Sequence, residues 1–304
     1  MSLTSTARVE IQGGALSDTI YQEIAELTYG QCGVDLRIGK KELVSSRLAR
    51  VLKQSDCSSF EQYLKILKAD TTGRFLTAMI DALTTNHTSF LRERQHFDFL
   101  AAQAPRLFSS RKNLEIWSAA SATGEEVYTL LMVLIEALKL PFPSAKTEGW
   151  LTLLGTDIST TVLEKAKAGI YQEEKLDPLP SEWKRKYFLK GKGIAEGTVR
   201  IRPELCRMAK FSQLNLIEAL PSEKLYPVIF CRNVMIYFDK STRQKVVQSL
   251  VSCLEPKGFF MTGHAESISG LDVGLTHVAP ALYQNRGLGQ IKRSTKIDQT
   301  KGAL

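Results

Sequence analysis

The sequence predicts an α/β fold, a doubly wound and mostly parallel sheet with an all-helical domain before it and a small antiparallel β-subdomain inserted in it. Residues 17–81 carry apolar side chains at helical spacing. From Asn113 onward, β-rich runs alternate with helical runs, which is typical of right-handed crossovers in a parallel sheet. With 304 residues, 43% of them hydrophobic, the chain is long enough for a large domain and a smaller one.

The N-terminal helical domain is expected over residues 15–83. Two apolar stripes predict its helices, Ile20, Ile24 and Leu27 in one and Val44, Leu48, Val51 and Leu52 in the other. On the second helix Arg47, Arg50 and Lys53 recur every three residues, away from the apolar side. This row is either a solvated charged face or a basic face that meets acidic helices of a partner protein.

The main domain is expected over residues 84–287. Strands are predicted at 113–120 and 150–159 and within 226–238 and 258–266, with helices at 127–140, 160–171 and 242–254. Ligands of such sheets bind at the carboxyl ends of the strands. Gly191, Gly193 and Gly197, followed by the alternating run "TVRIR", predict a β-subdomain over residues 181–212, which is either decoration or a docking surface.

The net charge of +8 is concentrated at the C-terminus. From Arg286 onward, five Lys or Arg against Asp298 give +4, so residues 288–304 are expected to be a flexible basic tail. The remaining mild excess of basic charge suits an acidic protein or a nucleic acid equally. No apolar run approaches the ~20 residues of a membrane span, and no secretory signal precedes the domain, which predicts a cytoplasmic protein without membrane insertion.

The cysteines and histidines favour neither a disulfide framework nor a metal site. The five cysteines, Cys32, Cys57, Cys206, Cys231 and Cys253, are scattered without a CxxC pair, so buried reduced thiols are expected. The four histidines, His87, His96, His264 and His277, have no metal-ligand partner at useful spacing in the sequence. We therefore expect no metal.

The segment after the first strand favours a cationic ligand over a phosphate. "SAASATG" consists of small residues, but neither Gly-Lys-Ser/Thr nor GxGxxG is present. Glu125 and Glu126 begin the next helix where a phosphate would bind; for Glu125 a dipole-stabilising cap is expected. Asp157, at the end of the second strand, lies where such folds bind ribose hydroxyls. Together these features fit a nucleoside with a cationic amino-acid moiety, which describes S-adenosylmethionine.

Several motifs closely resemble the CheR family of chemotaxis receptor methyltransferases over residues 15–285. They are "TTNHTSFLRE", "IWSAASATGEE", "GTDISTTVLEKAKAGIY", "FSQLNLIE", "VIFCRNVMIYFDKSTRQKVV" and "GHAES", with "GVDLRIGKKELVSSRLARVL" upstream. The resemblance implies a Rossmann-like class I S-adenosylmethionine-dependent methyltransferase, expected to be a monomer. Its reaction would esterify glutamate side chains on chemoreceptor helices and leave S-adenosylhomocysteine.

The same resemblance implies roles for individual residues. It places Asn86, Thr88 and Arg92 around the cofactor and reaction site, Glu126 at the methionine ammonium, Asp157 at the ribose, Asn215, Leu216, Arg232 and Asn233 around the adenosyl part, and Tyr237 near the transferred methyl. The segment Thr84 to Glu93 would fold over the cofactor as a lid. The β-subdomain resembles one that in some members binds a peptide at the receptor C-terminus.

The residues themselves indicate how such a transfer would proceed. A glutamate acceptor, with a reference pKa of ~4.3, is ionised at neutral pH and needs no general base. It needs a donor that orients it, and the planar guanidinium of Arg92 suits that role, with the Tyr237 hydroxyl in support. Two alternatives stay open at this point: a non-catalytic cofactor-binding scaffold, and a nucleic-acid methyltransferase.

Overall fold

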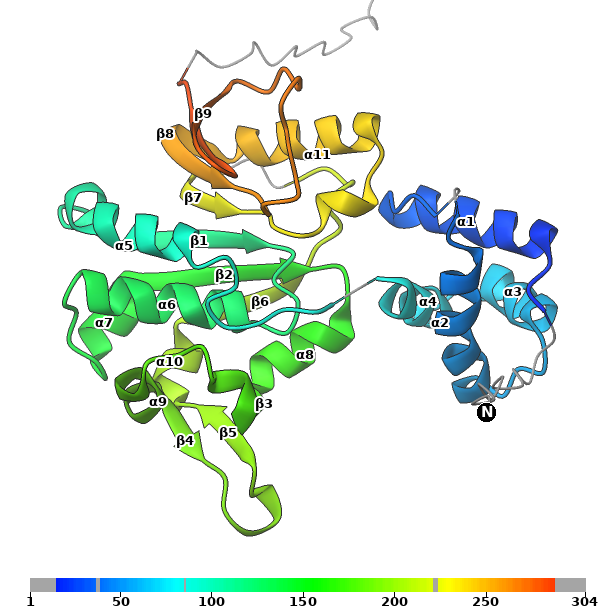
Figure 1. The fold of residues 1–304 in the computed structure, drawn as a ribbon, viewed down its shortest axis with the longest axis horizontal. Helices are drawn as coiled ribbons and strands as arrows, with labels where there is room; N and C mark the ends of the chain where they lie inside the picture. Colours follow the sequence, from blue (N-terminus) through cyan, green and yellow to red (C-terminus); the bar gives the residue numbers. More distant parts are fainter. Residues whose placement is uncertain (1–14, 37–38, 85, 221–223, 288–304) are drawn as a thin grey trace, which may run out of the picture.

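The N-terminal part of the chain is a bundle of four helices beside the main sheet (Figure 1). The computed structural model describes residues 15–36, 39–84, 86–220 and 224–287, so the expected tail at 288–304 lies outside the described residues. The helices of the bundle are α1 (Asp18–Cys32), α2 (Lys41–Gln54), α3 (Phe60–Ala69) and α4 (Arg74–Leu83). The two predicted stripes face inward: Ile24, Val44 and Leu48 are fully buried.

Local sequence sets the ends of these helices. The hydroxyls of Ser17 and Ser59 cap α1 and α3 by accepting hydrogen bonds from the backbone NH groups of Ile20 and Gln62. α1 ends at Gly33, whose φ of 72° is in the left-handed region. A Cβ at Gly33 would lie 2.7 Å from Ile217 and 2.9 Å from Thr242, so this turn also permits close packing between the helical bundle and the main domain.

The main domain is a seven-stranded sheet. Its strands are β1 (Leu114–Ala119), β2 (Leu151–Asp157), β6 (Ala209–Gln213), β7 (Tyr226–Phe230), β8 (Leu254–Met261), β9 (Leu275–Ala279) and β10 (Leu282–Asn285), in the order β6-β2-β1-β7-β8-β10-β9. The longer helices are α5 (Gln95–Phe108), α6 (Glu125–Ala137), α8 (Thr160–Ala168) and α11 (Lys240–Ser252), with the short α7 (Ala145–Trp150), α9 (Ser181–Tyr187) and α10 (Pro203–Arg207).

The sheet confirms the predicted doubly wound, mostly parallel arrangement. Strands β6, β2, β1, β7 and β8 pair in parallel, and only β10 and β9 are antiparallel. The strand order reverses direction between β1 and β7, which opens a crevice at the carboxyl ends of these strands. The sequence interpretation missed β6, β9 and β10. β6 and β9 carry mostly exposed or half-exposed side chains instead of an apolar run, and β10 is only four residues long.

Each face of the sheet contributes to a different hydrophobic core. On β1, Trp117 belongs to the core shared with α1–α4 and α11, whereas Ile116 belongs to the core shared with α5 and α6. This alternation follows from the two-residue period of a strand. The helical bundle lies beside the sheet (Figure 1), and its core is continuous with the core on the Trp117 face.

The β-subdomain is a three-stranded antiparallel sheet that projects from the main domain (Figure 1). Its order is β3 (Ile170–Gln172), β5 (Thr198–Ile201) and β4 (Phe188–Lys190). The predicted bounds of 181–212 are wrong at both ends. β3 begins directly after Gly169 caps α8 in the left-handed conformation, and residues 209–213 pair with β2 in the main sheet. No helix among the described residues has the length and apolar character that a membrane span requires.

Candidate active site

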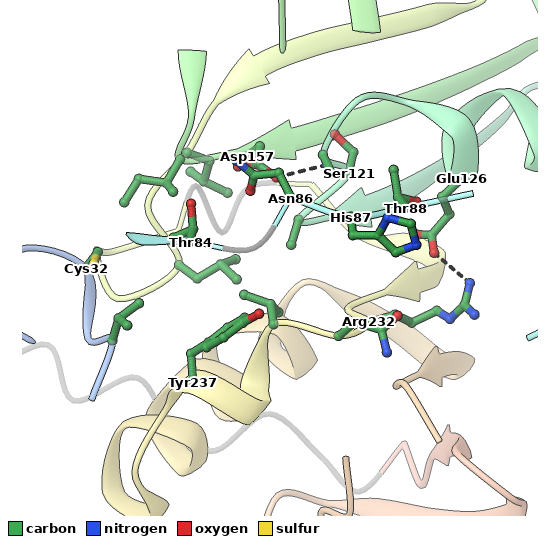
Figure 2. A pocket seen from close by; sticks show the side chains of 18 of the residues that line it. Cys32, Thr84, Asn86, His87, Thr88, Ser121, Glu126, Asp157, Arg232 and Tyr237 are labelled. Atoms are coloured by element: carbon green, nitrogen blue, oxygen red, sulfur yellow. Dashed lines mark hydrogen bonds and ion pairs between the residues drawn. The ribbon is translucent and has the colours of Figure 1, made fainter. Parts of the chain in front are cut away.

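A pocket lies at the carboxyl ends of β1, β2 and β7, where the strand order reverses (Figure 2). All ten residues singled out in the sequence line it: Asn86, Thr88, Arg92, Glu126, Asp157, Asn215, Leu216, Arg232, Asn233 and Tyr237. They come from five separate segments of the chain. The structure thus brings together every predicted site residue, while the role of each remains a prediction.

The turn after β1 forms one wall of the pocket. Ala120 and Ala122 have φ angles of 86° and 46°, a region that residues with a Cβ adopt at a cost. Hydrogen bonds from the end of β2 hold this turn: the Thr156 carbonyl accepts from the NH groups of Ala120 and Ser121, both at 2.8 Å, and the Asp157 carboxylate accepts from the NH of Ala122 at 2.9 Å. Small side chains let the backbone approach a ligand closely.

The two glutamates at the start of α6 point in different directions. Glu125 is fully buried and pairs with Lys175 of the β-subdomain, with 2.6 Å between Oε1 and Nζ. Glu126 lines the pocket, and its carboxylate accepts hydrogen bonds from the Ser118 hydroxyl at 2.8 Å and from Arg232 Nη1 at 2.7 Å. Only Glu126 is therefore placed to meet a ligand.

Asp157 is held rigidly at the end of β2. Its side chain is 8% exposed and accepts hydrogen bonds from the backbone NH groups of Ala122 at 2.9 Å and Ser159 at 3.0 Å. Burial raises the pKa of Asp157, although these hydrogen bonds favour the carboxylate. An acid fixed in this way is suited to accept hydrogen bonds from two adjacent hydroxyls.

Arg232 lies beneath the pocket as a buried ion-pair centre. Its guanidinium donates to Glu126 at 2.7 Å, to Glu93 at 3.0 Å and to the Arg92 carbonyl at 2.6 Å. Burial by itself raises the pKa of Glu93, but Arg232 and a hydrogen bond from Asn233 bring it below its usual value. Glu93 was not singled out in the sequence, because its partners lie about 140 positions away.

Glu266 is a second residue that sequence reasoning missed. The residue is 3% exposed. Its carboxylate accepts hydrogen bonds from the backbone NH groups of Asn233, Met235 and Gly263 at 2.6–2.7 Å, and from that of Ile236 at 3.3 Å. It thereby fixes the loop in which Asn233 has a φ of 60° and on which the pocket depends. The only sequence signal was the acid within "GHAES", a motif quoted for the resemblance without a role for its glutamate.

The segment that was predicted to act as a lid contributes Thr84, Asn86, His87, Thr88 and Arg92 to the pocket lining. Phe90 anchors it, since this ring is buried against Tyr171 and Phe188 at centroid distances of 5.1 and 5.6 Å. Arg92 is half-buried and its Nη1 donates to the His87 carbonyl at 2.7 Å. Within the described part of the chain Arg92 has no carboxylate partner, so its guanidinium keeps donors for a ligand.

The helical bundle supplies the remaining wall. Cys32 and Val34, at and after the end of α1, line the pocket, and Figure 2 shows Cys32 on the side away from Arg232. The NH of Asp35 donates to the Tyr237 carbonyl at 2.8 Å, and the Asn215 amide donates to the Gln31 carbonyl at 2.7 Å. Cys231, which precedes Arg232, is fully buried in the core, as expected for a reduced thiol, and is not among the pocket residues.

Two of the histidines are not isolated, contrary to the sequence interpretation. The rings of His96 and His264 lie 5.2 Å apart between centroids, and His96 Nδ1 lies 3.9 Å from Glu93 Oε2. The sequence gave no sign of this, because 168 positions separate the two histidines.

The pocket fits S-adenosylmethionine by the chemistry of its side chains. Ser121 lines the pocket with a buried hydroxyl that has no hydrogen-bond partner among the described residues. A buried hydroxyl of this kind is expected to bind a polar group of a ligand. Two acids, Glu126 and Asp157, match an ammonium group and a ribose, and the turn after β1 lacks the glycine-lysine cradle of a phosphate site.

Two family descriptions match the chain and together cover most of it. "CheR methyltransferase, all-alpha domain" matches residues 20–84, and "CheR methyltransferase, SAM binding domain" matches residues 86–280. The chain belongs to the CheR methyltransferase family. It is accordingly an S-adenosylmethionine-dependent methyltransferase with a class I fold.

Relatives of known activity support this membership over most of their length. The chain is 39% identical to the chemotaxis protein methyltransferase of Salmonella typhimurium over 260 residues, which are 84% of this chain and 86% of the relative. The corresponding enzyme of Escherichia coli is 38% identical over 272 residues, 88% of this chain and 91% of its own. Chemotaxis protein methyltransferase 2 of Pseudomonas aeruginosa is 40% identical over 250 residues, with coverages of 81% and 86%.

Proposed function

We propose that this CheR family enzyme methylates glutamate side chains on the helices of chemoreceptors, forming glutamyl methyl esters. One observation carries the choice of acceptor. Arg92 lines the cofactor pocket and has no carboxylate partner within the described residues, whereas Arg232 has two. A half-buried guanidinium with free donors favours an anionic acceptor over an amine.

The chain's task in this reaction is alignment. Bound S-adenosylmethionine supplies an electrophilic methyl group on a sulfonium. The attacking carboxylate oxygen must lie in line with it, and such positioning accounts for up to ~7–11 kcal/mol of a barrier. In our proposal the Arg92 guanidinium donates to the acceptor carboxylate, orients it and offsets its loss of water. No residue has to remove a proton, because the carboxylate is already ionised.

The cofactor-binding residues divide by the part of the ligand that they meet. Glu126 would accept hydrogen bonds from the methionine ammonium and Asp157 from the ribose hydroxyls. Asn215, Leu216, Arg232 and Asn233 would close around the adenosyl part, with Asn86 and Thr88 above it. Their convergence on one pocket supports these roles.

Tyr237 is proposed to support the acceptor. Its ring lines the pocket, and its hydroxyl has no hydrogen-bond partner among the described residues. A free phenol hydroxyl at this position can donate to the acceptor carboxylate. The side chain is half-exposed and packs in part against the core shared with the helical bundle.

The helical domain, expected over residues 15–83, is proposed to recognise the receptor. Arg50 and Lys53 are exposed on α2, while Arg47 is half-buried and donates to the Leu83 carbonyl at the end of α4. Two exposed cations on one helix face suit acidic receptor helices. The β-subdomain, with the exposed Ile170 and Leu189 on its outer strands, is the proposed place for a receptor C-terminal peptide.

Charge reversal on α2 tests this partner face. In Arg50→Glu/Lys53→Glu we expect the KM for receptor to rise about tenfold or more, because like charges would then face each other across the interface. The Kd of S-adenosylhomocysteine should not change. The control is Lys165→Glu/Lys210→Glu, which reverses two exposed lysines of the main domain. Equal rises in KM for both double variants would argue for a general charge effect instead of a docking face.

Labelling identifies the product. With methyl-labelled S-adenosylmethionine and receptor membranes, label should appear on receptor protein and be released as methanol by mild base. Base-stable label on protein would indicate transfer to nitrogen and contradict the proposal. Label on nucleic acid would favour the nucleic-acid alternative, and cofactor binding without any transfer would favour a scaffold.

A further inference from the structure

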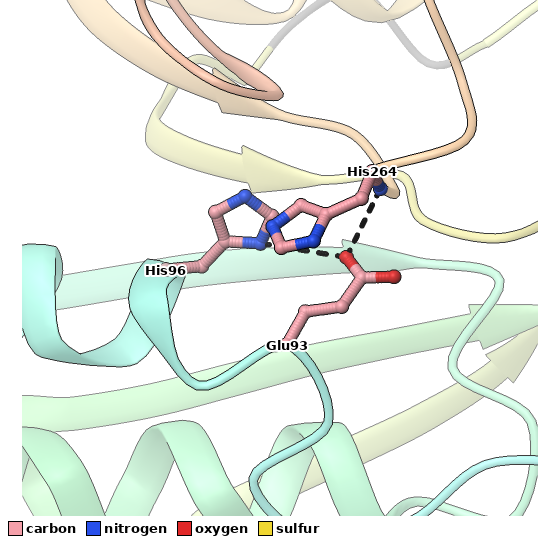
Figure 3. Close-up of side chains that lie close together, drawn as sticks. All are labelled: Glu93, His96 and His264. Carbon is pink, nitrogen blue, oxygen red and sulfur yellow. Dashed lines mark hydrogen bonds and ion pairs between the residues drawn. The ribbon is translucent and has the colours of Figure 1, made fainter.

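Near Arg232, three potential metal ligands that are far apart in the sequence lie close together (Figure 3). They are Glu93 before α5, His96 in the first turn of α5 and His264 in the loop after β8. One carboxylate oxygen and one nitrogen of each imidazole all lie within 4.8 Å of one another. None of the three lines the cofactor pocket, and the proposed transfer uses none of them.

His96 is otherwise unexplained at its position. The residue is 2% exposed, and neither ring nitrogen forms a hydrogen bond with any of the described residues. A neutral imidazole binds metals through a ring nitrogen that forms no other hydrogen bond. A buried polar group without a partner costs free energy that a ligand would recover.

The other two ligands complete a usable set. His264 is exposed, which leaves an open side for entry and for water ligands, and its backbone NH donates to Glu93 Oε2 at 3.2 Å. Two imidazoles and one carboxylate with an open position are a common protein ligand set for Zn²⁺ and related borderline ions, whereas Mg²⁺ and Ca²⁺ prefer oxygen alone. Bond lengths of ~2.0–2.2 Å require ligand atoms ~3–3.5 Å apart, so a bound ion would draw the three ligand atoms, which lie within 4.8 Å of one another, closer together.

We propose that Glu93, His96 and His264 form a binding site for a divalent ion of the zinc class, and that an ion bound there weakens cofactor binding. The second part rests on the proposed role of Glu126. Glu93 shares Arg232 with Glu126, at 3.0 and 2.7 Å. When an ion binds the Glu93 carboxylate, Glu126 is the one carboxylate left to pair with Arg232. Arg232 then pairs more strongly with Glu126 and competes there with the cofactor ammonium. Linkage requires the reciprocal effect, a lower ion affinity when cofactor is bound.

Zn²⁺ alone, titrated calorimetrically into the full chain, tests the site. We expect one strong site in the wild type and a loss of about tenfold to 100-fold or more in affinity in His264→Ala, since even the loss of a residue that only supports a ligand costs that much. His264 is exposed, so this variant should fold. The matched control is His277→Ala, which removes the exposed histidine of β9 and should bind as the wild type does. No strong Zn²⁺ binding by the wild type, or equal binding by His264→Ala, would overturn the site.

The coupling has its own measurement. With Zn²⁺ at saturation, the Kd of S-adenosylhomocysteine should rise several-fold in the wild type and in His277→Ala but stay unchanged in His264→Ala. If Zn²⁺ binds at this site and the Kd does not move, the coupling is wrong and the site stands. The role of Glu126 is tested separately in metal-free buffer, so its failure is distinguishable from a failure of the site.

Discussion

Replacement of Arg92 by alanine is expected to lower kcat for receptor methylation by about 10²–10³-fold, while the Kd of S-adenosylhomocysteine changes by less than about threefold. The guanidinium meets the acceptor in our proposal, and removal of one preorganised donor at a reacting group costs ~2.7–4 kcal/mol of transition-state stabilisation. The cofactor should be little affected, because the partners proposed for its ammonium and its ribose are Glu126 and Asp157. Single-turnover methylation and calorimetry measure the two quantities on the same preparation.

Arg94→Ala is the matched control, since this arginine lies two residues further on, is exposed and forms an ion pair with Asp98 on the surface. It should retain wild-type kcat and cofactor affinity. Arg92→Lys keeps the charge but loses the planar fork and should recover only part of the rate. Equal losses of kcat and of cofactor affinity in Arg92→Ala would assign Arg92 to cofactor binding and remove it from the acceptor site.

Glu126→Gln is expected to weaken S-adenosylhomocysteine binding by about 10-fold to 100-fold. Hydrogen bonds to a charged group contribute ~1.5–3 kcal/mol, and the amide keeps the shape of the side chain while losing its charge. The affinity should fall more for ligands that carry the ammonium than for adenosine alone, because adenosine does not reach this group. Calorimetry with both ligands gives the comparison.

Glu164→Gln serves as the control, because Glu164 lies on the exposed face of α8 and pairs there with Lys167. Its affinity for both ligands should match the wild type. Thermal unfolding of each variant shows whether Arg232, which keeps Glu93 and the Arg92 carbonyl as partners in Glu126→Gln, still holds the loop. A variant that folds and binds S-adenosylhomocysteine as tightly as the wild type would place the ammonium elsewhere.

The ten pocket residues were predictable chiefly through the motifs that resemble the CheR family. For Glu126, Asp157 and Tyr237 the pattern of strands and helices adds a physical reason, because they follow predicted strands and the carboxyl ends of parallel strands meet at one edge of a sheet. The short edge strands and the bounds of the β-subdomain were not predictable in this way, since three to five half-exposed residues carry little periodicity.

The ion pairs and hydrogen bonds of Arg232 and Glu266 beneath the pocket could not be predicted from the sequence. Arg232 meets Glu93 and Glu126, and Glu266 binds the loop after β7, through contacts that no local pattern encodes. The same holds for the approach of His96 to His264. Such contacts depend on how separate strands and loops pack in three dimensions, and they become visible only once the register of the sheet is known.

Residues at the end of α1 belong to the cofactor pocket, which matters for exchanging helical bundles between family members. The Asp35 NH donates to the Tyr237 carbonyl, and Cys32 and Val34 line the pocket. A graft joined near residue 84 would therefore also replace part of the cofactor site. If the helical bundle recognises the receptor, as proposed above, a chimaera with a foreign bundle would acquire a new receptor preference together with an altered cofactor affinity. Transfer of the preference alone requires residues 32–36 to stay with the main domain, so that the exchanged segment is discontinuous in sequence.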